Sequence, residues 1–266
     1  MCLILIAYRH RPEYPLLVAA NRDEFFERPT QTAQFWTDCP SVLAGRDLRH
    51  GGTWLGVDRA GRFAAVANYR EPSEADAGAV SRGLLVSNFL VGDMAPDPYL
   101  SVVSAASDRY DGFNLFVGDQ TALYFYSSYL QKPLQLEPGI HGISNGDLDS
   151  PWPKLIKGKE GLRKQLRVDG EVDAEQLFKL LADRTVPTDA SLPDSGVGIE
   201  WERKLAPIFV NGNGYGTRSS TLLICDRHGR VNFTERNFDQ VGNRTGDVHY
   251  SFSIESPAVA TGRNRY

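Results

Sequence analysis

Short apolar runs separated by polar turns dominate the first half of the chain, and this pattern predicts strands joined as hairpins. The opening run at 3–8 is followed by a second at 15–20, which ends in the charged tetrapeptide NRDE at 21–24. Because a hairpin between these runs turns near residues 11–13, it brings residues 21–23 beside residues 2–3. Two further pairs flank turns rich in Asp and Gly, as hairpins require; they are 53–57 with 62–67 and 113–117 with 123–127.

Apolar positions at helical spacing appear in two later parts of the chain. Ser81 is placed to cap a helix with one apolar face, and a second helix is predicted over 97–106. Further on, Ser150 and Pro151 have the cap-then-first-position arrangement that begins a helix. This lysine-rich helix is followed by another that begins at Asp173.

The last third returns to strands. Residues 217–225 and 230–234 form a third predicted hairpin around an Asp- and Gly-containing turn. The stretch 184–198, rich in Pro, Asp and Ser, is expected to be a surface loop. The polar chain from Gly242 onward is expected to be a loosely held tail.

The order of strands, helices, strands, helices and strands lacks the strict βα alternation of a parallel sheet. Hairpins dominate, so the sheets are expected to be mainly antiparallel. The predicted fold class is α+β, a four-layer αββα sandwich with helices on the outer faces of two sheets. We expect residues 1–266 to form a single domain.

Composition and charge narrow the function classes. The 266 residues are 41% hydrophobic and 23% charged, and 29 basic against 33 acidic side chains give a net charge of −4. No basic field for nucleic acid is expected, and no apolar run reaches the ~20 residues of a membrane span. The three irregularly spaced cysteines indicate a reducing, cytoplasmic setting. The scattered histidines predict no metal site, and no cofactor is expected to be required.

Cys2 is the position with the most chemical content. Removal of Met1, which a small second residue permits, leaves a thiol and a free α-amine on one residue. Their reference pKa values lie near ~8.5 and ~7.7–8.0, so the amine can accept the thiol proton, as in an N-terminal nucleophile. The alternative is that Cys2 is only a small apolar residue at the start of a strand.

The charged tetrapeptide supplies two candidate partners for this thiol. In the predicted hairpin, Arg22 is placed to lower the pKa of the Cys2 thiol, and Asp23 is placed to hold or orient the α-amine. The alternative is a solvated charged turn at the end of a strand.

Three more polar residues follow strand ends. Asn68 and Asn145 carry side-chain amides that can donate to an oxyanion, although both also suit turns. Arg218 enters a predicted strand, where an unpaired guanidinium is costly to bury. A carboxylate partner or an anionic ligand would explain it.

A set of short motifs along nearly the whole chain resembles the NRDE family, whose eukaryotic members are called transport and Golgi organisation protein 2. The motifs are Met1-Cys2, AANRDEF at 19–25, RP at 28–29, GRD at 45–47, GGTWLG at 51–56, NYR at 68–70, GISN at 142–145, PWPK at 151–154 and TRSS at 217–220.

This family in turn resembles the N-terminal-nucleophile hydrolases, especially the choloylglycine hydrolase and penicillin V acylase group, which cleave amide bonds with a mature N-terminal cysteine. The resemblance implies that Cys2 is the nucleophile and that Asp23 orients the amine. It matches Asn68 and Asn145 to two active-site asparagines, and Arg218 to a late active-site arginine.

The chain departs from the acylases at one position. They place an arginine three residues before the aspartate, where this sequence has Ala20. Arg22 instead precedes Asp23 directly, and neighbours on a strand face opposite sides. If Asp23 faces the thiol, Arg22 is expected to point away from it.

Two functions follow from these residues and the resemblance. One is a cysteine hydrolase acting on a non-peptide amide or acyl bond. The alternative, which the resemblance implies, is a non-catalytic carrier of haem or of acyl-coenzyme A and related lipids, with haem as cargo. Either uses a small anionic ligand, for which the candidate binding residues are Arg22, Arg46, Trp54 and Trp152. A secretory-pathway role is implied by the family name alone.

Overall fold

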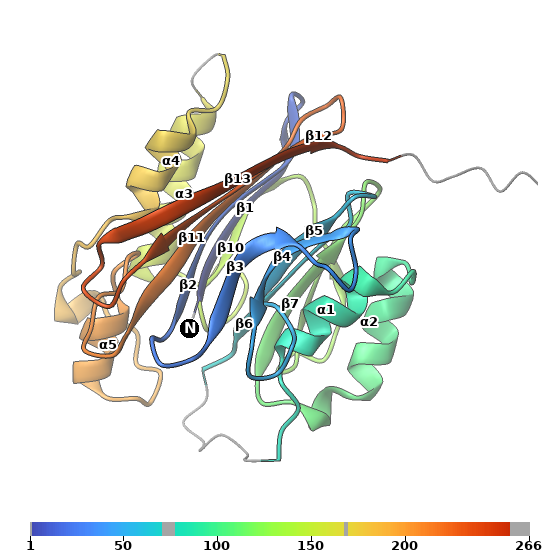
Figure 1. The fold of residues 1–266 in the computed structure, drawn as a ribbon. Coiled ribbons are helices and arrows are strands. Elements are labelled where there is room, and N and C mark those ends of the chain that lie inside the picture. The colour runs from blue at the N-terminus through green and yellow to red at the C-terminus, as the bar shows by residue number, and fades with distance from the viewer. Residues whose placement is uncertain (1, 71–77, 168–169, 256–266) are drawn as a thin grey trace, which may run out of the picture.

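Two antiparallel sheets lie face to face in the computed structural model, which describes residues 2–70, 78–167 and 170–255 (Figure 1). The first sheet has the strand order β10-β1-β2-β11-β12-β13. Its strands are β1 Cys2–Arg11, β2 Tyr14–Phe25, β10 Gly139–Ile143, β11 Tyr215–Cys225, β12 Arg230–Phe238 and β13 Arg244–Ser253. The second sheet has the order β3 to β9. Its strands are β3 Thr30–Phe35, β4 Val42–Asp47, β5 Leu55–Asp58, β6 Phe63–Asn68, β7 Phe113–Gly118, β8 Leu123–Ser127 and β9 Leu134–Gln135.

Helices cover the outer face of each sheet, which confirms the predicted αββα sandwich (Figure 1). α1 and α2 pack on the second sheet, and α3 and α4 pack on the first. The helices are α1 Gly83–Val91, α2 Pro96–Ala105, α3 Pro153–Leu166, α4 Ala174–Leu181 and α5 Ile199–Leu205, with short 3₁₀ turns at Ser107–Arg109 and Asp189–Ser191.

Strand alternation distributes most of the apolar side chains among three large cores, beside a small cluster of Leu205, Val210 and Tyr215. Ile4 and Ile6 of β1 face the core between the sheets. Leu3 and Leu5, on the other face of the same strand, pack against α3 and α4. A third core fills the space between the second sheet and α1 and α2. At β1 and β2 the first sheet is therefore buried on both faces, and these strands are accordingly apolar over most of their length rather than alternating, whereas β12 alternates.

The register of the first hairpin confirms the prediction for its open end. Cys2 lies opposite Arg22, and Leu3 lies opposite Asn21. On the other side of β2, Asp23 lies opposite Thr217 of β11. The start of the chain, the NRDE tetrapeptide and the start of β11 therefore meet at one end of the first sheet.

Two helix starts differ from the sequence prediction. α1 begins after Arg82, with no side-chain cap, so Ser81 does not cap it. α3 begins at Pro153 with Trp152 as its N-cap, two residues later than the expected start at Pro151. Proline is favoured at the first position of a helix, and Pro153 meets this preference as well as Pro151 does. Asp173 does cap α4, accepting hydrogen bonds from two backbone amides.

The prediction of a loose tail from Gly242 was wrong over 244–253, which form β13 and pair with β12 along its length. Residues 256–266 of that predicted tail lie outside the described residues. The expected loop at 184–198 is confirmed apart from one 3₁₀ turn. The hairpin of β3 and β4, and the helix α5, were not predicted.

The described residues also show whether the chain has a membrane span, disulfides or a metal site. In the part of the chain that the structure describes, no helix is long and apolar enough to cross a membrane. Cys2, Cys39 and Cys225 are free thiols. Among the described residues, His, Cys, Asp and Glu side chains do not gather in groups of three that would hold a metal ion.

Candidate functional site

A cavity of about 480 Å³ lies at the end of the sandwich where the chain begins. Its walls come from both sheets and from the segment that leads into α1. The candidate residues on its lining are Cys2, Arg22, Asp23, Arg46, Trp54, Asn68 and Arg218. Asn145 and Trp152 do not line it.

Cys2 is the first residue of β1 and is 8% exposed. Burial raises the pKa of its thiol, and the nearby Asp23 carboxylate raises it further. Arg22 and a backbone hydrogen bond with Asp23 lower the pKa of the thiol against this trend. Because desolvation is the largest effect, the thiol is held mainly in its protonated form at neutral pH and needs a base to become a nucleophile.

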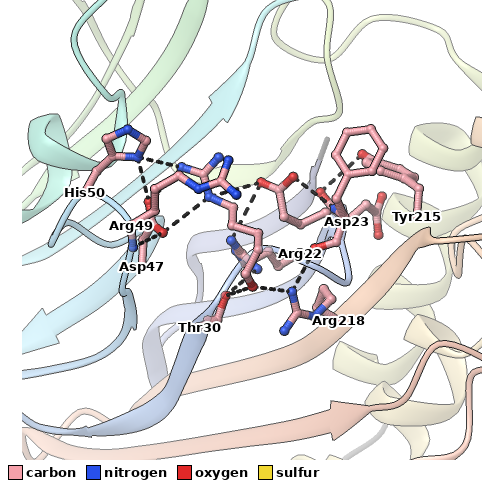
Figure 2. Close-up of polar contacts among 11 residues, drawn as sticks. Arg22, Asp23, Thr30, Asp47, Arg49, His50, Tyr215 and Arg218 are labelled. Atoms are coloured by element: carbon pink, nitrogen blue, oxygen red, sulfur yellow. Dashed lines mark hydrogen bonds and ion pairs between the residues drawn. The ribbon is translucent and has the colours of Figure 1, made fainter.

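Arg22 shares the cavity face with Cys2, contrary to the expectation that it points away from the thiol. Residues directly opposite on antiparallel strands project to the same side of the sheet, and Arg22 is the partner of Cys2. Its guanidinium lies 3.7 Å from Glu24 and 3.5 Å from the hydroxyl of Thr30 (Figure 2).

The carboxylate of Asp23 projects to the other face of β2, toward the helical layer. Its Oδ1 accepts a hydrogen bond of 2.7 Å from the Thr217 hydroxyl. Tyr215 donates to the Asp23 carbonyl oxygen at 3.2 Å (Figure 2). Burial raises the pKa of Asp23, and Lys154, followed by smaller contributions that include Thr217 and Arg22, lowers it.

Arg218 reaches the cavity because of a β-bulge. Thr217 pairs with Asp23 and Ser219 pairs with Arg22, which leaves Arg218 as an extra residue on β11. A bulge re-aims side chains, and both Arg218 and Ser219 line the cavity. The guanidinium of Arg218 donates to the carbonyl oxygens of Phe25 and Arg28 (Figure 2).

Two cavity arginines have no carboxylate within ion-pair distance among the described residues, namely Arg218 and Arg82. Burial lowers the pKa of both guanidiniums. Arg82 donates to the Gly112 carbonyl oxygen at 3.0 Å, and Asp111, Glu24 and Cys2, in that order, partly offset the effect of burial on its pKa. These two cations are partly desolvated without a full counter-charge, which is the condition that favours binding of an anion.

The remaining cavity cations are paired. Arg28 forms an ion pair of 2.7 Å with Asp47, which also contacts His50 at 3.4 Å (Figure 2). Arg46 contacts Asp38 through both its terminal nitrogens, at 2.6 and 2.7 Å, and stacks over Trp36. The charge of Arg46, a predicted ligand-binding residue, is therefore already compensated.

Asn68 and Asn145 are neighbours in the structure, but only Asn68 lines the cavity. Asn68 ends β6 at the cavity, and its side-chain amide makes no hydrogen bond with any residue of the described ranges. Asn145 is buried, and its Nδ2 donates to the Asn68 carbonyl oxygen at 2.9 Å. Asn145 thus ties the loop after β10 to the end of β6.

The two candidate tryptophans also differ. Trp54 is half-buried and lines the cavity beside Val66. Trp152 caps α3, packs against the core under the helices and lies under the guanidinium of Arg70, with the guanidinium carbon 5.0 Å from its ring centre.

The charged residues in or next to the site that sequence reasoning missed include Arg82, Lys154 and Glu235. Glu235 of β12 lines the cavity, is 4% exposed and accepts a hydrogen bond of 2.8 Å from the Ala33 amide. A signal existed for Glu235, because it continues the inward alternation of Val231 and Phe233. Lys154 lies in the PWPK motif, but nothing in the sequence marked it as buried, and Arg82 carried no signal, since at the start of a helix a solvated side chain is the ordinary case.

The sequence of this chain is similar to those of known proteins. Residues 1–240 match the family described as Transport and Golgi organisation 2. The chain belongs to this family. It is 38% identical to the Transport and Golgi organization protein 2 homolog of Bos taurus, with 89% of this chain and 92% of that protein covered. It is 35% identical to the Homo sapiens homolog, with 96% and 100% covered.

A solved structure supports the fold. A mutant conjugated bile acid hydrolase from Clostridium perfringens superimposes with a TM-score of 0.50 at 10% identity, and covers 96% of this chain and 92% of that one. At this identity the likeness is one of fold. The chain has the N-terminal-nucleophile hydrolase fold that the NRDE resemblance implied.

Proposed function

We propose that this member of the Transport and Golgi organisation 2 family is a cysteine N-terminal-nucleophile hydrolase, acting on a non-peptide amide or acyl bond of an anionic, partly apolar ligand. The observation that carries the proposal is the place of Cys2. It lies at the start of β1, in a cavity that also receives Arg22, Arg218 and the amide of Asn68, which makes no hydrogen bond within the described ranges. The three free thiols support a reducing cellular compartment.

The reaction begins once Met1 is removed and the α-amine belongs to Cys2. This amine takes the thiol proton, and the sulfur attacks the carbonyl carbon to form a C–S bond. The C–N, C–O or, in a thioester substrate, C–S bond then breaks, and the leaving group carries away the proton. Water hydrolyses the thioester and restores the thiol. Because burial raises the pKa of Cys2, proton transfer to the amine is a required step.

The oxyanion that forms during attack needs a hydrogen-bond donor. Asn68 supplies the side-chain amide that faces the cavity, and Asn145 fixes the backbone of Asn68 through their hydrogen bond. In this proposal Asn145 is a positioning residue, and Asn68 is the donor.

The lining chemistry supports an anionic ligand with an apolar part. Arg82 and Arg218 offer two cations without carboxylate partners in the described chain, and Trp54 and Val66 offer apolar surface. A carboxylated amide, an acyl thioester and haem share this chemistry. A raised thiol pKa combined with these arginines also favours the second candidate, a carrier that binds haem or acyl-coenzyme A without turnover.

The experiment that decides between them uses Cys2→Ala with Cys39→Ala as the matched control. Purified protein, with Met1 removal checked by intact mass, is assayed against panels of amides and acyl thioesters and titrated with haem and acyl-coenzyme A. A hydrolase loses turnover in Cys2→Ala and keeps its affinity. Turnover that survives in Cys2→Ala overturns the nucleophile. Absence of turnover in the processed wild type, together with tight binding, assigns the carrier.

A further inference from the structure

Four charged side chains are buried on the helical side of the first sheet, behind the cavity. They are Asp23, Lys154, Arg70 and Glu202. Lys154 belongs to the first turn of α3 and Glu202 to α5, whereas Arg70 follows β6. Two positive and two negative groups make the set neutral. A folded protein tolerates several buried charges close together when each has a partner of opposite charge.

Two members of this set already satisfy each other. Arg70 donates to Glu202 at 2.8 Å, with about 5% of each side chain exposed. The second carboxylate oxygen of Glu202 accepts a hydrogen bond of 3.1 Å from the Ser195 amide. Arg70 also stacks over Trp152. The charge of Glu202 is therefore neutralised by Arg70, and Lys154 needs a different carboxylate to balance its charge.

Lys154 is held in an unusual position for a cation. Its Nζ donates a hydrogen bond of 2.8 Å to the carbonyl oxygen of Leu205, the last residue of α5. This contact orients the ammonium, but a carbonyl dipole does not neutralise a full buried charge. The N-terminal turn of α3 disfavours a cation because the helix dipole is positive there, and that turn contains no acidic residue.

Asp23 is the carboxylate that meets this requirement. Its side chain accepts from Thr217 on the face of the first sheet that α3 and α4 cover. Leu205, whose carbonyl oxygen holds the Lys154 ammonium, packs with Tyr215, and the Tyr215 hydroxyl donates to the Asp23 carbonyl oxygen. Lys154 and Asp23 therefore belong to one buried cluster, and each shifts the pKa of the other in the direction that favours its charged form.

We propose that Lys154 is a positioning residue that keeps the Asp23 carboxylate ionised behind Cys2. Asp23 then offers a fixed negative charge to the α-ammonium that Cys2 acquires when it gives up its thiol proton. This last consequence rests on the proposed hydrolase function, but the ionisation of Asp23 does not. The positive charge that acts on Asp23 thus comes from Lys154 of α3, because Ala20, three residues earlier on β2, carries no charge.

The test reads Asp23 directly, by carbon NMR of protein labelled at the aspartate side-chain carboxyl carbon. The Asp23 resonance is assigned by its loss in Asp23→Asn. In the wild type we expect an ionised Asp23 at pH 7. In Lys154→Met its titration midpoint rises by at least about one pH unit, a tenfold change in proton affinity. Lys154→Arg restores the wild-type midpoint. The matched control, Lys157→Met, lies on the same helix and ion-pairs with Asp183; it leaves the midpoint unchanged.

An Asp23 midpoint that is the same in Lys154→Met and in the wild type overturns the proposal. If Lys154→Met does not fold, the Cys2→Ala protein gives the answer without altering Lys154. Burial lowers the pKa of Lys154 to about 8, so the Asp23 resonance shows a second inflection near that pH. The α-amine, whose reference pKa is also about 8, acts on Asp23 too. The inflection is therefore compared with that of Cys2→Ala/Lys154→Arg, in which the part due to Lys154 disappears because a guanidinium does not titrate in this range. The other groups that act on the pair are Cys2, Arg22, Arg70 and Glu202. Tyr215 contacts Asp23 as well, and burial raises the pKa of Tyr215 well above its ordinary value.

A smooth Asp23 signal between pH 7 and 9.5, with no second inflection, also overturns the role of Lys154. Both readouts are independent of turnover. A protein that hydrolyses nothing but shows the coupled titration retains this inference and loses the hydrolase proposal. A protein that hydrolyses amides with an unchanged Asp23 midpoint does the reverse.

Discussion

Cys2 and Arg22 face each other directly across the β1–β2 hairpin, so the thiol and the guanidinium project from the same side of the first sheet. Asp23, one residue further, projects to the other side and contacts Thr217. The two charged neighbours of Cys2 therefore act from different environments. Arg22 acts within the cavity, and Asp23 acts from the helical layer.

The first prediction concerns Arg22. Replacing it by Gln removes a positive charge that lowers the pKa of the Cys2 thiol. Alkylation of Cys2 by iodoacetamide at pH 7.5 should slow by about threefold to tenfold, measured by peptide mass spectrometry. The control is Arg49→Gln, an exposed arginine nearby (Figure 2). Equal alkylation rates in the two variants would contradict the effect of Arg22.

The second prediction separates the two acids of the tetrapeptide. The carboxylate of Asp23 raises the pKa of the Cys2 thiol, so Asp23→Asn lowers that pKa and speeds alkylation at neutral pH by a few-fold, on the order of threefold. Glu24→Gln is the control, because Glu24 pairs with Arg22 and Arg28. If both variants react with iodoacetamide at the same rate, the tetrapeptide acts only as a charged turn.

The third prediction addresses the anion site. Arg218→Ala and Arg82→Ala each remove one cavity cation without a carboxylate partner in the described ranges. Affinity for haem or for acyl-coenzyme A, whichever the wild type binds, should fall by about tenfold in each variant. Calorimetric titration measures it, with Arg49→Ala as the control. Unchanged affinity in Arg218→Ala would remove the anion site from the proposal.

The fourth prediction concerns pH and stability. His141 contacts Asp149 at 3.0 Å, and this carboxylate raises the pKa of His141. A raised pKa in the folded state means that folding favours the protonated ring. The contribution is therefore fully present below the unfolded value near ~6.5 and is lost as the pH rises through the folded value.

Urea unfolding of the wild type and of His141→Gln tests this. The stability difference between them, about 1 kcal/mol or less, should be largest at pH 5.5 and decline by pH 8.5. A difference between wild type and His141→Gln that grows with pH would have the wrong sign.

The sequence predicted the hairpins and the sandwich because turn chemistry and apolar runs are local signals. It also placed residues 21–23 beside residues 2–3, since equal arm lengths around a turn fix the register. The sequence did not predict β3 and β13, because their polar residues hide the apolar pattern of a strand. β3 carries Thr30 and Thr32 at the cavity, and β13 is an edge strand with an exposed face.

The site was harder to predict than the fold because its residues depend on which face of a strand is covered. Cys2, Arg22 and Asn68 could be proposed from strand ends alone. Lys154 could not, because its burial results from α5 packing over the start of α3, and α5 itself has no strong periodicity in its seven residues.

The hydrogen bond between Glu235 and Ala33 joins the two sheets through one side chain. Ala33 lies in the irregular pairing between β3 and β4, where its amide is available to a partner outside its own sheet. The carboxylate of Glu235 spans from β12 to this amide at the wall of the cavity. With the Arg22–Thr30 contact and the packing of Phe35 on Tyr250, this hydrogen bond holds β3 against the first sheet beside the cavity. A substitution at Glu235 therefore alters the cavity wall and the contact between the sheets at the same time.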